Sequence, residues 1–212
     1  RGRFSKAELK EADAFCRENG IELIPCIQTL AHLNAMFKWA NRYGAINDTA
    51  DILLAGDDRT YELIDKIFAT LSECFTTRKI HIGMDEAWGL GTGNYLKQKG
   101  YKNGTEIFCA HIKAVKQITD KYHLKPMIWS DMYFRLGSKT GDYYDKETQI
   151  PAYVKELLPE NVRLTYWDYY HHDEETYRFM IEKHKEITEN LVFAGGIWQW
   201  TGFLPDYDHT FK

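Results

Sequence analysis

The chain has 212 residues, of which 44% are hydrophobic and 27% charged, and this is the composition of a globular protein rather than a disordered one. Its length suffices for one domain with a buried core. A formal net charge of −4 argues against a nucleic-acid partner, because phosphate binding requires a basic surface. No apolar run is long enough to cross a membrane, so no membrane partner is expected either.

Helices and short apolar strands are predicted to alternate along the chain. A capping box at residues 5–8 begins the first helix and Gly20 ends it. Further helices are predicted over residues 60–75, 105–122, 151–158 and 174–189, and strands over residues 21–27, 79–84, 125–130, 162–167 and 191–194. Strands that alternate with helices imply a parallel sheet.

The number of predicted strands limits the possible architectures. No GxGxxG motif follows the first strand, which disfavours a dinucleotide-binding fold. A TIM barrel needs eight βα units and typically about 250 residues, and about five strands fall short of that. The sequence therefore predicts an α/β fold that is a partial (β/α)8 TIM barrel, in a single domain over residues 1–212.

The end of the second predicted strand is the most informative stretch. Residues 79–84 are followed directly by the adjacent carboxylates Asp85 and Glu86, then by Trp88 and three glycines. The carboxyl ends of strands are where α/β proteins build their chemistry. We therefore expect Asp85 and Glu86 at the rim of the sheet as catalytic groups; a solvated acidic pair is the alternative.

The segment His81-Ile82-Gly83-Met84-Asp85-Glu86 resembles the His-x-Gly-Gly-Asp-Glu signature of glycoside hydrolase family 20, the β-N-acetylhexosaminidases, with Met84 in place of the second glycine. The resemblance implies a catalytic barrel of which this chain holds the third to the seventh strand. The first two strands, with an arginine and an aspartate of the sugar site, have no counterpart here, and the last strand is also expected to be missing.

The resemblance also implies an activity and a mechanism. The enzyme would be an exo-β-N-acetylhexosaminidase that hydrolyses terminal β-linked GlcNAc or GalNAc with retention. In this substrate-assisted variant of glycoside hydrolysis the 2-acetamido oxygen of the sugar is the nucleophile. Glu86 would be the general acid/base and Asp85 would orient the acetamido N–H. The expected partners are N-acetylhexosamine-terminated glycans, and no cofactor is expected.

His32 is the third expected catalytic residue. It ends the run at residues 24–32, which resembles a family segment whose histidine supports the acid/base glutamate. Gln28 stands where that segment usually has an aspartate. A neighbouring imidazole can tune a carboxyl group, so the role is physically sensible. A lone histidine after a strand is, as the alternative, a structural residue.

Tryptophans are expected to wall the sugar site. Trp129 and Trp198, at the ends of the third and fifth predicted strands, match indoles that enclose the acetamido group in the family. Trp88 is expected to contact the sugar as well. Trp200 stands where the family usually has a glutamate that contacts sugar hydroxyls. Ordinary core packing is the alternative for these side chains.

A tyrosine and an aspartate complete the expected site. Tyr166 and Asp168 match a Tyr-x-Asp motif in which the phenol donates to the acetamido oxygen and the carboxylate binds the outer hydroxyls. Tyr169 is the alternative phenol if the register differs. Packing in a tyrosine-rich layer is the alternative role.

Two other hypotheses stay open. No metal site is expected at His171 and His172, because adjacent histidines in a loop point apart. A different hydrolase could still bind a metal through His81, Asp85 and Glu86. A non-catalytic glycan-binding protein could keep the aromatic cleft without hydrolysing anything.

The cysteines and the sheet edges give the last expectations. Cys16, Cys26, Cys74 and Cys109 form no Cys-x-x-Cys motif, and free thiols in a reducing compartment predict a cytoplasmic location. An incomplete barrel would expose the edges of a parallel sheet. We therefore expect weak activity or none from this chain alone, and self-association through these edges.

Overall fold

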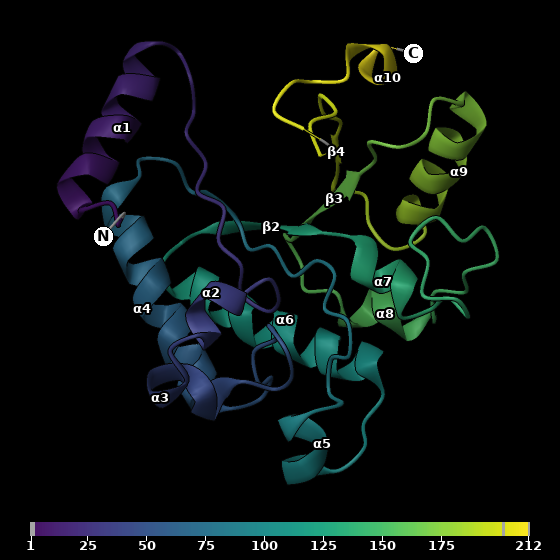
Figure 1. Cartoon of the computed structure of the whole chain (residues 1–212), viewed down its shortest axis with the longest axis horizontal. Coiled ribbons are helices and arrows are strands. Elements are labelled where there is room, and N and C mark those ends of the chain that lie inside the picture. The colour runs from purple at the N-terminus through teal and green to yellow at the C-terminus, as the bar shows by residue number, and fades with distance from the viewer. Residues whose placement is uncertain (1–2, 201, 212) are drawn as a thin grey trace.

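The computed structural model describes residues 3–200 and 202–211 (Figure 1). Its elements in chain order are α1 (Lys6–Glu18), α2 (Asn34–Phe37), α3 (Ala40–Tyr43), the 3-10 helix η1 (Gly44–Ile46), α4 (Asp58–Cys74), β1 (Lys79–His81), α5 (Asn94–Lys99), α6 (Gly104–Lys121), β2 (Lys125–Trp129), α7 (Asp131–Arg135), α8 (Tyr153–Leu157), β3 (Arg163–Trp167), α9 (Glu174–Lys185), β4 (Leu191–Ala194) and α10 (Tyr207–Thr210).

The four strands form one sheet in the order β1-β2-β3-β4, and all neighbours are parallel. At least one helix connects each strand to the next, as a parallel sheet requires. Figure 1 shows the sheet running through the middle of the molecule, with α1 and α4 toward the left of the view and α9 toward the right. The expected α/β class with parallel strands is confirmed.

The first predicted strand, residues 21–27, differs from the expectation. Its one ladder pair is an isolated parallel bridge between Cys26 and His81. The His81 N–H donates to the Pro25 carbonyl at 2.9 Å and the Ile27 N–H donates to the His81 carbonyl at 2.8 Å. Pro25 has no N–H to donate, and Ile21 is 57% exposed, so the segment pairs with β1 over its last residues alone.

The two faces of the sheet have different partners because side chains alternate along each strand. Ile80, Ile128 and Leu164 are completely buried on one face. They belong to one hydrophobic core with Phe68 of α4 and Phe108 of α6. Register places a second row on the opposite face, and its members are His81, Met127, Trp129, Thr165, Trp167, Val192 and Ala194.

The five predicted helices begin within two residues of the expected positions, whereas α2, α3, α5, α7 and α10 were not predicted. The Ser5 hydroxyl accepts the Glu8 N–H while the Glu8 carboxylate accepts the Ser5 N–H, which is the predicted capping box of α1. Asn103 caps α6 through the Thr105 N–H at 2.8 Å. The two caps fix the starts of α1 and α6. Both helices contact α4, and the three form one layer beside the sheet.

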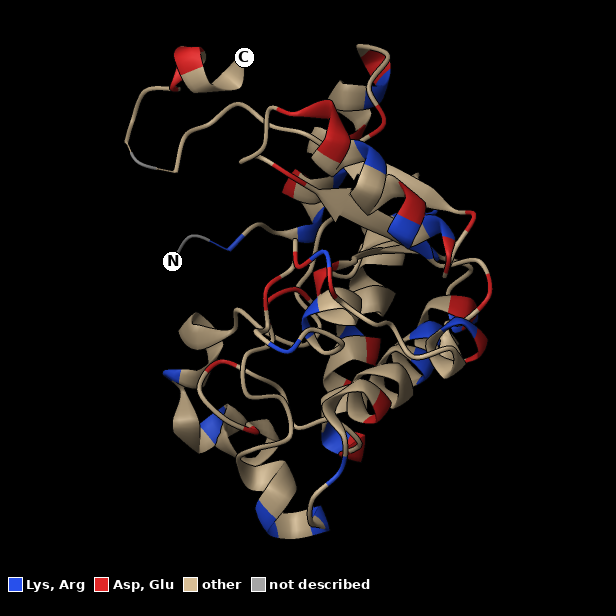
Figure 2. Cartoon of the chain, turned by 90° about the vertical axis from the view of Figure 1, so that its right-hand side faces the viewer, with Lys and Arg blue, Asp and Glu red and all other residues tan. Residues whose placement is uncertain are grey.

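Lys and Arg (blue) and Asp and Glu (red) are interspersed along the ribbon in Figure 2. This distribution accords with the net charge of −4 and with the absence of a basic stripe in that view. Within residues 3–200 and 202–211, no helix has the combination of length and apolarity that crossing a bilayer requires.

Candidate active site

The turn after β1 has an unusual backbone. Gly83, Met84 and Glu86 have φ angles of 68°, 74° and 48°, in the left-handed region that non-glycine residues rarely adopt. A Cβ atom at Gly83 would lie 2.1 Å from Oε1 of Gln28, so only glycine fits there. Neighbouring structure must hold such a turn in place, and strained segments of this kind are concentrated at functional sites.

Gln28 holds the turn from the first half of the chain. Its side-chain amide donates from Nε2 to Oδ1 of Asp85 at 2.8 Å. Its Oε1 accepts the backbone N–H of Met84 at 3.1 Å. One neutral side chain therefore fixes both the backbone of the turn and the orientation of the first carboxylate.

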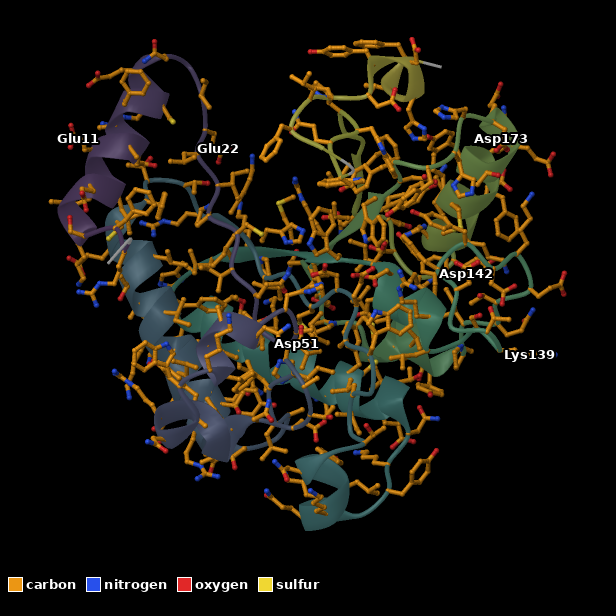
Figure 3. The ribbon with its side chains drawn as sticks, in the orientation of Figure 1. Glu11, Glu22, Asp51, Lys139, Asp142 and Asp173 are labelled. Atoms are coloured by element: carbon orange, nitrogen blue, oxygen red, sulfur yellow. The ribbon has the colours of Figure 1, made fainter. Side chains whose placement is uncertain are left out.

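The structure brings His32, Asp85 and Glu86 together, as expected. Nε2 of His32 lies 3.1 Å from Oδ2 of Asp85 and 3.6 Å from Oε2 of Glu86. Its Nδ1 lies 3.9 Å from Oδ2 of Asp51, which is near the centre of the molecule in Figure 3. The imidazole thus lies among three carboxylates, with two of them on one nitrogen.

Asp131 and Arg135, which the sequence reasoning missed, contact Glu86 from the next strand end. The Glu86 N–H donates to Oδ2 of Asp131 at 3.0 Å. Nε of Arg135 donates to the same oxygen at 2.9 Å, and Nη2 of Arg135 donates to Oε1 of Glu86 at 3.4 Å. The signal in the sequence was the i, i+4 spacing of an acid and a base just after a strand.

Asp131 is completely buried. Burial raises the pKa of its carboxyl group to about 6, even though the Glu86 N–H and Arg135 stabilise the charged form. Within the described part of the chain, its Oδ1 has no hydrogen-bond partner. A buried carboxyl group with a raised pKa and an oxygen without a partner destabilises the fold, and such groups are concentrated at functional sites.

Trp129 lies where the sequence predicts, at the end of β2 on the face that carries His81. The two rings are 4.3 Å apart between centroids, at 50°. Nδ1 of His81 accepts the Gly83 N–H at 3.2 Å, and burial lowers the pKa of this imidazole to about 4. His81 is therefore neutral at pH 7 and serves as a support between the turn and the indole.

Tyr166 and Asp168 do not reach this site. The Tyr166 hydroxyl donates to Oδ2 of Asp168 at 2.7 Å, and both side chains are buried. The Tyr166 ring lies 4.9 Å from that of His184 in α9 and 5.3 Å from that of Phe193. Thr165 is the register partner of Trp129 and shares its face of the sheet. Tyr166 is the next residue, and successive side chains of a strand point to opposite faces, so Tyr166 faces the helices instead of the carboxylates.

Tyr169, the alternative phenol, lies on the side of the carboxylates. Its ring stacks on Trp167 at 5.7 Å and 23°, on the same face as Trp129. Burial, then Tyr170 and the charge of Asp85, raise the pKa of its phenol. Trp200 packs against this ring at 5.4 Å, whereas Trp198 packs on Tyr170 at 5.2 Å.

Arg135 connects the Trp88 indole to the Glu86 carboxylate. The Arg135 guanidinium lies 4.4 Å from the centre of the indole, and the indole is 55% exposed. The same two side chains line a cavity of about 380 Å³ together with Tyr101 and Leu136. Trp88 thus extends the site outward from Glu86.

The histidines after β3 have structural partners. Nδ1 of His171 lies 2.9 Å from Oδ2 of Asp168, and the ring of His172 lies 4.6 Å from that of His209. In residues 3–200 and 202–211, no three His, Cys, Asp or Glu side chains are grouped as metal ligands. His81 turns its Nδ1 to the Gly83 N–H rather than joining Asp85 and Glu86.

Solved structures with a similar fold include three β-N-acetylhexosaminidases. The GH20 enzyme from Streptomyces coelicolor A3(2) has a TM-score of 0.60 at 19% identity, over 91% of this chain and 34% of that one. The enzyme from Bacteroides fragilis NCTC 9343 has a TM-score of 0.59 at 19% identity, over 87% and 35%. A further β-N-acetylhexosaminidase has a TM-score of 0.62 at 18% identity, over 91% and 39%. These likenesses show the fold, a partial TIM barrel.

Sequence comparison shows the family. The chain is 24% identical to Hexosaminidase D of Homo sapiens in an alignment 177 residues long, which covers 78% of this chain and 33% of the human protein. The chain thus spans about a third of the length of this relative and of the first structures above. Residues 1–190 match the catalytic domain of glycosyl hydrolase family 20, and the chain belongs to that family.

Proposed function

We propose that the protein is a retaining exo-β-N-acetylhexosaminidase that uses the 2-acetamido group of its substrate as the nucleophile. The observation that carries the proposal is the contact of one imidazole nitrogen, Nε2 of His32, with both Asp85 and Glu86. Two carboxylates held on one nitrogen lie on the same side of a sugar. They suit a division of work between proton transfer and amide orientation better than a pair on opposite faces of the bond.

In the first step Glu86 donates a proton to the glycosidic oxygen while the acetamido oxygen bonds to the anomeric carbon and the leaving group departs. Asp85 accepts the acetamido N–H and stabilises the positive charge of the resulting oxazolinium ion. In the second step the Glu86 carboxylate takes a proton from water, the water oxygen bonds to the anomeric carbon, and the ring opens to the acetamide. Glu86 ends protonated, ready for the next cycle.

Two aromatic side chains have roles in this proposal. Tyr169 would donate from its phenol to the acetamido oxygen, since its ring lies on the carboxylate side and Tyr166 is hydrogen-bonded to Asp168 on the other. A donor there orients the nucleophile and stabilises its developing charge. Trp129, supported by His81, would form the apolar wall against the acetyl methyl group.

The experiment compares two aryl glycosides, a nitrophenyl N-acetyl-β-glucosaminide and the corresponding β-glucoside with a free 2-hydroxyl. We expect hydrolysis of the first and little of the second, because the second lacks the nucleophile. Equal turnover of both would contradict substrate assistance and would indicate a protein nucleophile. Loss of activity on chelation would instead support a metal-dependent hydrolase.

A variant separates catalysis from binding. Glu86→Gln should abolish hydrolysis while binding of N-acetylglucosamine, measured by calorimetry, persists. If a chain that also carries the first two strands and the last strand of the barrel binds this sugar but never hydrolyses the acetamido substrate, it is a glycan-binding protein rather than an enzyme. Weak activity of these 212 residues alone, and their self-association, stay predictions that turnover and sedimentation measurements test.

A further inference from the structure

Four contacts connect Glu86, Asp131, Arg135 and Trp88. Asp131 accepts the Glu86 N–H at 3.0 Å and the Arg135 Nε–H at 2.9 Å, Arg135 donates to Oε1 of Glu86 at 3.4 Å, and its guanidinium covers the Trp88 indole at 4.4 Å. We propose that Asp131 and Arg135 are positioning residues that hold Glu86 where it can give its proton to the leaving group. This inference rests on the proposed function and assigns two residues to it.

Asp131 holds the backbone of Glu86. The φ of 48° at Glu86 is costly for a residue with a side chain and persists only where neighbours enforce it. Asp131 is fully buried at the start of α7, two residues after the end of β2, so its carboxylate is a rigid acceptor. Its hydrogen bond therefore fixes the direction in which the Glu86 side chain leaves the turn.

Arg135 holds the carboxylate end of the same residue. Its guanidinium has five partners, which are Oδ2 of Asp131, Oε1 of Glu86, the Gly141 carbonyl at 3.2 Å, the Trp88 ring and, at 5.8 Å, the Tyr143 ring. The Arg135 side chain is 12% exposed, against 37% for that of Glu86, so the better fixed partner orients the freer one. A planar guanidinium with several partners loses little further freedom on holding a carboxylate.

The two oxygens of Glu86 are held from different sides. Oε1 faces Arg135 at 3.4 Å and Oε2 faces His32 at 3.6 Å. The carboxyl plane is thus set by one group on each oxygen. Because Asp131 is paired with Arg135, the two together orient Glu86 while their opposite charges largely offset each other.

The test uses two N-acetyl-β-glucosaminides, with 4-nitrophenol and with 4-methoxyphenol as leaving groups. Nitrophenolate departs with little help from an acid, whereas methoxyphenolate needs the proton. In Arg135→Gln and Asp131→Asn we expect kcat/KM for the methoxyphenyl substrate to fall by about 100-fold, and for the nitrophenyl substrate by less than about 10-fold, within the range of general acid catalysis.

Matched controls separate positioning from stability. Asp13 is also buried and accepts a backbone N–H, that of Thr76, at 3.2 Å, and Arg59 is an exposed arginine paired with Asp57. Asp13→Asn and Arg59→Gln should leave the ratio of the two kcat/KM values unchanged. Equal losses on both substrates in Arg135→Gln and Asp131→Asn would overturn the proposal, because they would mean a purely structural role.

A second measurement is independent of hydrolysis. In Asp131→Ala the Glu86 amide loses its acceptor, and its protection from hydrogen exchange, followed by NMR, should fall at least about 10-fold, the factor of a 1.4 kcal/mol difference. In Asp13→Ala the Glu86 amide should be unaffected. Unchanged protection in Asp131→Ala would refute the positioning role, and this measurement does not require the protein to hydrolyse either substrate. Absence of hydrolysis, with protection lost as expected, would refute the proposed activity and leave the positioning contact supported.

Discussion

The side-chain amide of Gln28 donates to Oδ1 of Asp85 at 2.8 Å while its carbonyl oxygen accepts the Met84 N–H. These two hydrogen bonds need an amide, because a donor and an acceptor must project from one planar group. The segment before β1 thereby contributes to the carboxylate turn, and Gln28 differs here from the aspartate that the family segment usually has.

Gln28→Glu tests this pairing. The new carboxylate would face Asp85, so the like charges would repel each other and the donor to Oδ1 would be lost. We expect activity to fall at least about 10-fold and the free energy of unfolding by roughly 1–3 kcal/mol. Kinetics with the nitrophenyl glycoside measure the activity, and urea titration measures the free energy of unfolding. Gln98→Glu on the exposed face of α5 is the matched control and should change neither.

Gly83→Ala tests the strained turn. At a φ of 68° an alanine is strained, and its Cβ would overlap Oε1 of Gln28, so the amide that holds Asp85 must move. We expect a loss of roughly 3 kcal/mol in unfolding free energy, together with loss of activity. Gly20→Ala has a similar φ of 74° but no atom within 4 Å of the new Cβ, so it should cost about 1 kcal/mol and leave activity intact. Similar costs at both glycines would contradict the contact with Gln28.

The pH dependence of stability follows from buried groups. Burial lowers the pKa values of His81, His111 and His184 to about 4 from 6.5, so the stability they contribute is complete above pH 6.5 and is lost as the pH falls toward 4. Asp131, whose pKa burial raises to about 6, acts in the opposite direction, because the folded state takes up its proton first.

Between pH 6 and 5 the three histidines bind more protons in the unfolded chain, whereas Asp131 binds more in the folded chain. The unfolded chain therefore binds a net of about two more protons, and the free energy of unfolding falls by roughly 2–3 kcal/mol per pH unit. Urea titrations at a series of pH values measure this slope. His184→Gln should reduce it by about one proton. A flat profile over this interval would show that the three imidazoles are not buried as neutral groups.

A pair of tyrosine variants tests the assignment of the phenol. Tyr169→Phe should reduce kcat for the acetamido substrate by about 100-fold, the scale of one lost donor to a developing oxyanion, with little change in stability. Tyr166→Phe removes the donor to the buried Asp168, so it should cost roughly 1–3 kcal/mol in stability and leave kcat of the folded protein unchanged. The reverse pattern would place the substrate on the helix side of the sheet.

The sequence by itself determined what depends on local order. The alternation of strands and helices, the capping box at Ser5 and the adjacent carboxylates Asp85 and Glu86 are read from neighbouring residues. His32 was also found, because its segment has a recognisable pattern. In each case a short run of residues carries the signal, so no knowledge of long-range packing is needed.

Only the tertiary structure decided which side chains meet. The Tyr-x-Asp match favoured Tyr166, whereas the structure stacks Tyr169 on Trp167, on the face of the sheet that carries Trp129. Successive side chains of a strand point to opposite faces, so a difference of one residue in register decides which phenol faces the site. Gln28 and Arg135 reach Asp85 and Glu86 across 57 and 49 residues of chain. Such contacts form through chain folding over long separations, and no periodicity in the sequence records them.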